Sequence, residues 1–241
     1  MRTEADLYVE TGYQILFEDD FFLAVDKPAP LPVHPVGRFK EKNLLSLLIR
    51  DLRPGPEGLK IVNRIDSETS GLVLVAKSGA MAGKLGILFQ DRAVVKEYHA
   101  VVFGAPEPRE GSITLALGTK TEGRQHLRTA DAQGEEARTD FRVLSSGGGH
   151  SLLKIVPHTG RTHQIRAHLS FLGHPVVGDK IYIDARIFER YIDEGWKEDM
   201  RPVVKAERLL LHASCLEFCH PVSGKPVKLT SAIPSCFGPF L

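Results

Sequence analysis

A polar segment at residues 63–72, with the sequence Asn-Arg-Ile-Asp-Ser-Glu-Thr-Ser-Gly-Leu, restricts the fold of this chain more than any other stretch. It follows a mostly apolar approach at 59–62 and leads into a β-branched, apolar run at 72–76. Short apolar runs rich in β-branched residues are typical of buried strands. The segment is therefore predicted to be a loop that connects two strands, with Asp66 in that loop.

The polar residues of this loop have two alternative roles. Buried strands can hold a loop in place while its side chains stay accessible to a ligand, so catalytic groups are frequent in such loops. Alternatively, the side chains form an Asx or Ser/Thr turn and hydrogen-bond only to nearby backbone. Local chemistry leaves both roles open for Asp66, Ser67, Thr69 and Ser70.

Residues 64–72 resemble the Arg-(Leu/Ile)-Asp-x-x-Thr-Ser-Gly-Leu motif of the RluA-type pseudouridine synthases. Further segments agree with this family in order and spacing: Asp-Lys-Pro at 26–28, Lys-Glu-Tyr-His-Ala-Val-Val-Phe-Gly at 96–104, His-Thr-Gly-Arg-Thr-His-Gln-Ile-Arg-Ala-His at 158–168, and Leu-His-Ala at 211–213 with His220, Pro221 and Gly224. The resemblance extends over roughly residues 14–230, so it does not depend on one short motif.

The resemblance implies a fold and a domain organisation. We expect an α+β fold, namely a single pseudouridine synthase catalytic domain with a mixed, mostly antiparallel sheet, flanking helices and a central RNA-binding cleft. Residues 14–241 are expected to form this domain after an N-terminal leader at 1–13, with a helical insert at about 185–207. Many relatives carry an N-terminal S4 RNA-binding domain; we expect none here, because it would not fit into the few residues before Tyr13.

Pseudouridine synthases detach uracil from ribose, rotate it and rejoin it through C5. The reaction needs a carboxylate at C1′, a group that moves a proton and a pocket with little water. By resemblance, Asp66 is the catalytic carboxylate, and Tyr98 lies against the base and takes part in proton transfer. Arg166 is implied to pair with Asp66, because a buried carboxylate needs a positive partner to stay ionised. The family implies no metal and no redox cofactor.

The resemblance also suggests residues that bind the RNA substrate. Arg64 matches an arginine that enters the space left by the flipped base, and Leu211 matches an apolar residue that closes the pocket. Arg161 is expected to contact phosphate or brace its loop, although an alternative gives Arg161 the pairing with Asp66. Lys27 is expected to be either an electrostatic contact to RNA or an ordinary surface lysine.

The expected partner is a stem-loop of ribosomal or transfer RNA. A uridine must leave its stack to react, at a cost of a few kcal/mol, and selective RNA recognition favours loops and bulges. The formal net charge of +1 neither favours nor excludes RNA, since a local basic face is enough. Residues 151–180 supply such a bias, with four lysines and arginines and a single acid, Asp179.

Bulk properties agree with a cytoplasmic protein. With 241 residues, 42% of them hydrophobic, the chain can bury a core. Three late cysteines, Cys215, Cys219 and Cys236, indicate free thiols in a reducing compartment. The sequence has neither an apolar signal peptide nor an apolar run of about eighteen residues for a membrane helix. A monomer suits a protein that uses a cleft for RNA.

The sequence departs from the family in one motif position and allows competing interpretations. Asn63 stands where the family usually has histidine. How the substrate is positioned at this end of the Asp66 loop therefore stays open. A metal site is disfavoured, because histidines spaced by five or six residues do not share a helix face and the cysteines near His220 lack a second pair. A non-catalytic RNA-binding protein is one alternative. A glycosidase is another, but it requires a second catalytic acid.

Overall fold

The computed structural model describes residues 8–240 except 38, 54, 56–57 and 123–124. The chain divides into two compact units. The first comprises Met1–Lys96 and Ala213–Ala232, and the second comprises Glu97–His212 and Ile233–Leu241. The boundaries fall inside two strands, β5 (Val95–Phe103) and β11 (Leu211–Cys219), so each of these strands contributes residues to both units.

Antiparallel strands form the centre of the first unit. Strand β2 (Phe22–Lys27) pairs with β1 (Gln14–Glu18) and with β4 (Ser70–Ala76). The short β3 (Lys60–Ile61) also pairs with β4, and β12 (Pro226–Thr230) pairs with β11. The turn between β1 and β2 forms at Asp19, whose carboxylate accepts the backbone N–H groups of Phe21 and Phe22.

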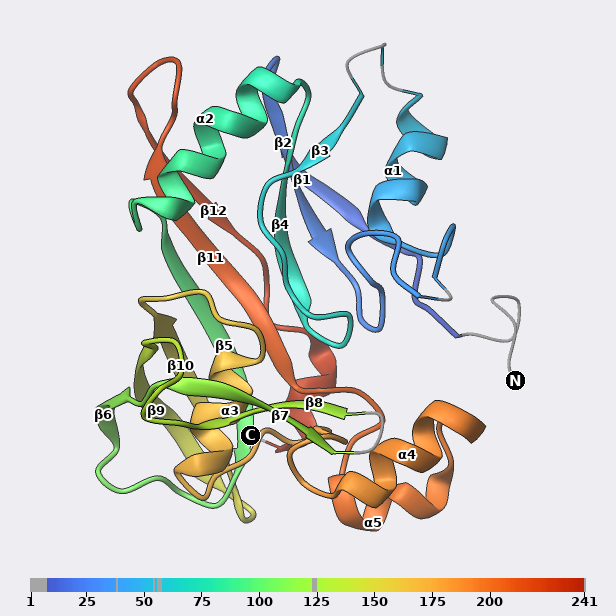
Figure 1. The fold of residues 1–241 in the computed structure, drawn as a ribbon, viewed down its shortest axis with the longest axis vertical. Helices are drawn as coiled ribbons and strands as arrows, with labels where there is room; N and C mark the ends of the chain where they lie inside the picture. Colours follow the sequence, from blue (N-terminus) through green and yellow to red (C-terminus); the bar gives the residue numbers. More distant parts are fainter. Residues whose placement is uncertain (1–7, 38, 54, 56–57, 123–124, 241) are drawn as a thin grey trace. The chain divides into compact units, whose positions relative to one another are not determined.

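Two helices cover opposite faces of these strands (Figure 1). Helix α1 (Leu44–Leu52) packs on Leu23 and Val25 of β2, whereas α2 (Gly79–Gln90) packs on the alternate residues Phe22 and Ala24. Strand β4 is buried along its whole length, because side chains on both of its faces meet a helix layer. This explains why residues 72–76 are continuously apolar.

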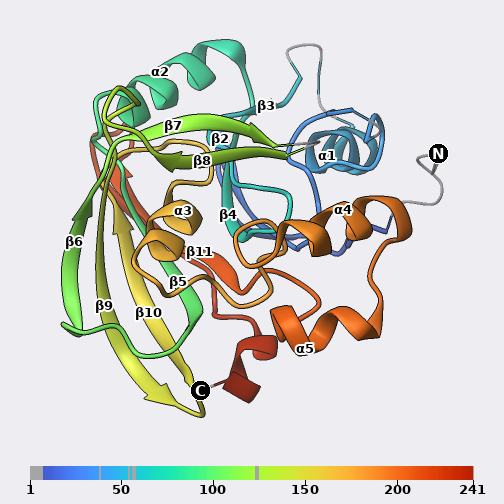
Figure 2. The same ribbon diagram turned by 60° about the horizontal axis from the view of Figure 1, so that its bottom comes forward.

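The second unit contains a sheet in the order β5, β10 (His150–Pro157), β9 (Arg138–Gly147) and β6 (Glu110–Thr114), with antiparallel pairing throughout. Helix α3 (Gln164–Phe171) packs on one face of this sheet (Figure 2). The C-terminal turn η3 (Ser235–Phe240) packs through Phe237 on Val101 and Leu152. A separate hairpin of β7 (Leu117–Glu122) and β8 (Gln125–Ala130) contacts α3 through Leu117 and Ala167.

Most of residues 185–204 are helical. They form α4 (Ala185–Glu194), η2 (Glu198–Met200) and α5 (Arg201–Val204). Ile187, Met200 and Val204 make a small core of their own, and Tyr191 and Trp196 pack against it. The interleaved aromatic residues of this segment therefore serve packing.

The α+β fold class with a sheet and flanking helices is confirmed, while the strand before the Asp66 loop is shorter than predicted. Helix α3 begins at Gln164, because the preceding His163 has a left-handed backbone with φ of 54°. The apolar approach at 59–62 forms only two residues of strand, at Lys60–Ile61. None of the helices in the described ranges is long and apolar enough to cross a membrane.

Candidate active site

The loop that carries Asp66 is anchored from inside the first unit by Lys27. The Lys27 side chain is fully buried. Its ammonium group donates hydrogen bonds to the carbonyl oxygens of Pro28, Leu31 and Ser67, at 2.9, 2.8 and 3.1 Å. The Ser67 carbonyl also accepts the backbone N–H of Leu31 at 2.8 Å. The residue that follows Asp66 is thus tied to the neighbouring proline-rich loop.

This placement corrects the expectations for Lys27. A lysine with 0% exposure is not a surface residue, and its ammonium cannot touch an RNA phosphate while it stays buried. Burying an ammonium group is costly unless other polar atoms replace its water. The carbonyl groups around the Lys27 ammonium supply that replacement. Lys27 therefore supports the loop from inside the first unit.

Asn63 holds the first end of the same loop. Its side-chain oxygen accepts the backbone N–H of Leu74 at 2.7 Å, and its amide nitrogen donates to the Leu72 carbonyl at 3.3 Å. The Asn63 amide therefore continues the hydrogen bonding along β4 beyond the end of β3. The structure gives this unusual motif residue a local structural role.

Gly71 closes the other end of the loop. Its backbone has φ of +112°, and a Cβ atom there would lie 2.2 Å from the carbonyl oxygen of Ala213 in β11. Any larger residue would separate the start of β4 from β11 within the first unit. Asp66 is half-buried in the loop between these fixed ends, and Arg64 is exposed. Arg64 lies near His34, whose pKa is lowered by burial and by the arginine charge.

In the second unit, one hydrophobic cluster brings together several predicted site residues. Tyr98 packs against a cluster that includes Leu211 of β11 and Ile165 and Leu169 of α3. Tyr98 is half-buried, whereas Leu211 is 3% exposed. Because Arg166 follows Ile165 in α3, this cluster fixes the helix that carries the predicted arginine next to the strand that carries Tyr98.

A buried glutamine organises the loop that leads into α3. The Gln164 side-chain oxygen accepts the Thr159 hydroxyl at 2.6 Å and the Arg161 backbone N–H at 3.1 Å. Its amide nitrogen donates to the Arg138 carbonyl and to the Thr139 hydroxyl, both at 3.0 Å. These bonds hold the turn at 159–163 against β9 and so define where α3 begins.

His168 extends this network on the next turn of α3. Its Nε2 lies 3.0 Å from the Leu115 carbonyl, an acceptor that requires a proton on Nε2. Its Nδ1, 2.9 Å from the Thr139 hydroxyl, therefore accepts that hydroxyl's proton. Burial lowers the pKa of His168 and outweighs the opposing effect of the Leu115 carbonyl. The ring is neutral as a result.

Arg161 braces the loop before α3. Its Nη1 pairs with the Glu135 carboxylate at 2.8 Å, and its Nε donates to the Glu136 carbonyl at 3.2 Å. Glu135 also pairs with Arg128 of β8. The hydrogen bond from Arg128, with the added charge of Arg161, lowers the pKa of Glu135. Of the two expectations for Arg161, these contacts favour bracing over phosphate binding.

Arg166 forms a buried, two-pronged ion pair with Asp179. Its Nε and Nη2 atoms lie 2.7 and 2.9 Å from the two carboxylate oxygens. Arg166 is 5% exposed and Asp179 is 1% exposed. Burial alone would raise the pKa of Asp179, but the Arg166 charge and hydrogen bonds bring this pKa below its ordinary value. The predicted partner of Arg166, Asp66, belongs to the other unit, so that pairing stays a prediction.

Sequence reasoning missed the residues that position Arg166. Asp179, Gln164 and Thr139 were not assigned to the site, although each is buried and hydrogen-bonded around α3. Asp179 left one signal, because it is the single acid among the cations of residues 151–180. The sequence contains no such signal for Thr139, since this residue contacts Gln164 and His168 only through the packing of β9 on α3.

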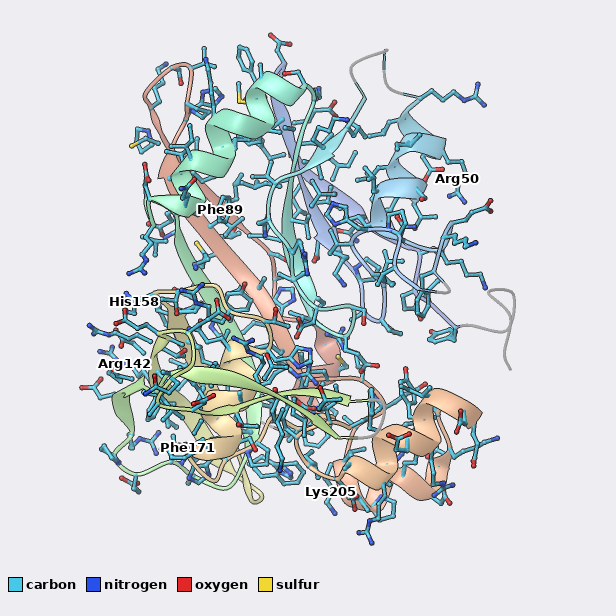
Figure 3. All side chains as sticks on the ribbon, in the orientation of Figure 1. Arg50, Phe89, Arg142, His158, Phe171 and Lys205 are labelled. Carbon is cyan, nitrogen blue, oxygen red and sulfur yellow. The ribbon has the colours of Figure 1, made fainter. Side chains whose placement is uncertain are left out.

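Surface charges of the second unit pair across strands. Arg142 and Glu110 pair at 2.8 Å, and the His158 ring lies 2.7 Å from the Asp140 carboxylate. Arg142 and His158 are labelled in Figure 3. Within the described ranges, the structure holds no group of three or more His, Cys, Asp or Glu residues placed to bind a metal ion.

Known proteins resemble this chain over most of its length. A family model described as RNA pseudouridylate synthase matches residues 21–171. The ribosomal large subunit pseudouridine synthase D of Pseudomonas aeruginosa is 35% identical over 227 residues, which cover 93% of this chain and 69% of that protein. The protein of the same name from Zymomonas mobilis is 32% identical over 228 residues, 92% of this chain and 69% of that protein.

A solved structure agrees with these sequence matches. Human RNA pseudouridylate synthase domain containing 1 superposes with a TM-score of 0.72 at 29% identity, covering 92% of this chain and 83% of that one. The matched family region contains Asp66 and Tyr98 and extends to the end of α3. The chain belongs to the RNA pseudouridine synthase family, the isomerases that convert uridine in RNA to pseudouridine.

Proposed function

We propose that Asp66 is the carboxylate that attacks or stabilises C1′ of the target uridine. The observation that carries this proposal is the construction of its loop. Lys27, Asn63 and Gly71 fix the loop by contacts beneath and at both ends, while Asp66 itself stays half-buried. A loop that is fixed at both ends and leaves the Asp66 carboxylate partly accessible suits a nucleophile that must meet a single sugar carbon.

Arg166 and Tyr98 complete the proposed catalytic set. Arg166 is held by its pair with Asp179. Its positive charge is proposed to stabilise the ionised form of Asp66. Tyr98, packed by its ring on the cluster beside α3, is assigned to stacking on the uracil, with its hydroxyl in proton transfer.

Substrate binding is assigned to Arg64 and Leu211. Arg64 is exposed two residues before Asp66, and its guanidinium is proposed to fill the space of the flipped uridine. Leu211 is proposed to close the base pocket on its apolar side. Arg161 is assigned to bracing the loop before α3 through Glu135.

The proposed substrate is a stem-loop of large-subunit ribosomal RNA, with transfer RNA as the alternative. The relatives from Pseudomonas aeruginosa and Zymomonas mobilis carry ribosomal large subunit in their names, which supports this choice. The proposal includes a monomer that acts in the cytoplasm through a central cleft, with no metal and no redox cofactor. The helical residues at 185–207 are proposed to help select the RNA.

The experiment that tests this function measures tritium release. Large-subunit ribosomal RNA and transfer RNA, labelled with 5-³H-uridine, would be purified separately from a strain that lacks the gene. Each RNA is incubated with the wild-type protein and with Asp66→Asn. Release occurs only when C5 loses its hydrogen, so the assay reports the isomerisation itself.

Release from ribosomal RNA by the wild type, and none by Asp66→Asn, is the expected result. Release from transfer RNA alone would change the substrate and keep the reaction. Equal release by Asp66→Asn would contradict the role of Asp66. RNA binding without release from either RNA would favour a non-catalytic protein and turn attention to Asn63.

A further inference from the structure

The carboxylate of Asp179 is built into the turn that follows α3. Its Oδ1 accepts the backbone N–H groups of Ile181 and Tyr182, each at 3.0 Å, in addition to the bond from Arg166. Its Oδ2 accepts Nε of Arg166. The backbone of residues 179–182 therefore determines the orientation of the carboxylate, and the carboxylate determines the orientation of the guanidinium.

Tyr182 of the same turn contacts the guanidinium of Arg166 with its ring. The centre of the Tyr182 ring lies 5.3 Å from Cζ of Arg166, within the range of a cation–π contact. The Tyr182 hydroxyl accepts the backbone N–H of Arg128 in β8 at 3.0 Å and lies 3.4 Å from Nδ1 of His163. Tyr182 is thereby anchored to the hairpin and to the residue that precedes α3.

We propose that Asp179 and Tyr182 are positioning residues for the isomerisation, which hold the Arg166 guanidinium in its reactive orientation before RNA binds. This inference rests on the proposed function, in which Arg166 stabilises the catalytic carboxylate. A free arginine side chain samples many rotamers, whereas a guanidinium held by a carboxylate fork and an aromatic ring is already oriented. Asp179 and Tyr182 act through Arg166 and are not assigned any contact with the substrate.

The burial of this pair distinguishes it from an ordinary ion pair of the same unit. Arg142 and Glu110 also pair at 2.8 Å, but their side chains are 68% and 66% exposed. Exposed pairs contribute little to stability or orientation because water competes for both charges. Arg142 and Glu110 therefore provide the matched control, in which an arginine loses its carboxylate partner away from α3.

The test compares Asp179→Asn, Tyr182→Leu and the control Glu110→Gln. Single-turnover rates would be measured with excess protein on 5-³H-uridine-labelled large-subunit ribosomal RNA, corrected for the folded fraction from circular dichroism. Filter binding gives the Kd for the same RNA. Asp179→Asn and Tyr182→Leu are expected to lower the rate about 10- to 100-fold, with Kd changed less than about threefold. Glu110→Gln should leave both values within about twofold.

A double-mutant cycle separates positioning from general loss of structure. If Tyr182 acts through Arg166, then Arg166→Lys combined with Tyr182→Leu loses little more rate than the slower single variant. The same cycle is measured with Asp179→Asn. If Asp179→Asn does not fold, the Tyr182 cycle alone tests the inference. Additive losses in the cycle, or wild-type rates in Tyr182→Leu, would overturn the inference.

The outcomes also distinguish this inference from the function on which it rests. An inactive wild-type protein would refute the proposed function. An active wild type with an equally active Arg166→Lys would refute the role of Arg166 and the inference with it. A slow Arg166→Lys beside fully active Tyr182→Leu and Asp179→Asn would refute the positioning roles alone.

Discussion

Arg166 and Asp179 form a buried ion pair in which two nitrogens of one guanidinium meet both oxygens of one carboxylate, at 2.7 and 2.9 Å. Neither side chain is more than 5% exposed. Removal of either partner would leave an uncompensated charge in the interior, which is more costly than the loss of the contact itself. The pair therefore couples the stability of the second unit to the orientation of a proposed catalytic residue.

The first prediction contrasts the two arginines at the start of α3. Arg166→Ala should lower the free energy of unfolding by about 3–5 kcal/mol, because it removes the positive partner of the buried Asp179 carboxylate. The same variant should abolish tritium release. Arg161→Ala removes a partly exposed pair with Glu135 and should cost about 0–1 kcal/mol while turnover continues. Urea denaturation and tritium release measure the two effects. Loss of turnover in Arg161→Ala with activity spared in Arg166→Ala would reverse the assignments.

The second prediction concerns the support beneath Asp66. Lys27→Met keeps much of the side-chain volume but removes the ammonium group from the buried carbonyls, including that of Ser67. We expect the free energy of unfolding to fall by about 2–3 kcal/mol and the rate of tritium release to fall with it. Lys84→Met on the exposed side of α2 is the control, with a change within about 0.5 kcal/mol. Equal stability of the two variants would show that the Lys27 contacts are unimportant.

The third prediction tests the close approach at Gly71. Gly71→Ala forces a Cβ atom to within 2.2 Å of the Ala213 carbonyl, on a backbone with φ of +112°. The free energy of unfolding should fall by at least about 3 kcal/mol. Gly83→Ala, in the interior of α2 with no heavy atom within 4 Å of its Cβ position, should instead stabilise by up to about 1 kcal/mol. A mild effect at Gly71 would mean that β4 and β11 separate easily.

The fourth prediction concerns pH. His168 has a lowered pKa in the folded protein, so the unfolded chain binds its proton at a higher pH than the folded chain. The resulting stability is complete above the unfolded pKa of about 6.5 and is lost as pH falls below it, by at most about 1.4 kcal/mol per pH unit. The pKa values of His34 and His99 are also lowered by burial, and they add slope of the same sign.

The contribution of His168 is isolated by comparing wild type with His168→Gln. Urea denaturation at pH values from 7.5 down to 5.5 should show a shallower loss of stability in the variant, since one of the protons taken up on unfolding is removed. The difference between the two proteins should therefore shrink as pH falls. Parallel curves would show that the Thr139 and Leu115 contacts do not keep His168 neutral.

Sequence patterns predicted the elements whose formation depends on neighbouring residues. The β-branched run at 72–76 was expected to be a strand and forms β4. The turn at Asp19 and the cap of α1, where Asn43 accepts the Ser46 backbone N–H, are likewise made by residues close in sequence. Apolar periodicity, turn residues and capping act over a few residues, so they are visible without a fold. Family membership was visible for the same reason, because the motifs are short and continuous.

The network around the site was decided only by the tertiary structure. In the sequence, nothing distinguishes Lys27 from other lysines near prolines. Its role is visible only in the fold, where its ammonium group donates to the carbonyl of Ser67 in the Asp66 loop. Thr139 reaches Gln164 and His168 because β9 packs under α3. No local pattern encodes such contacts.

The partner of Arg166 shows this division most clearly. The spacing of apolar residues, which the sequence alone shows, turns Ile165, the neighbour of Arg166 in α3, toward the core. The sequence also shows that Asp179 is the single acid among the lysines and arginines of residues 151–180. Only the turn after α3 brings that carboxylate to the guanidinium, because a buried charge takes whichever partner the surrounding packing leaves within hydrogen-bonding distance.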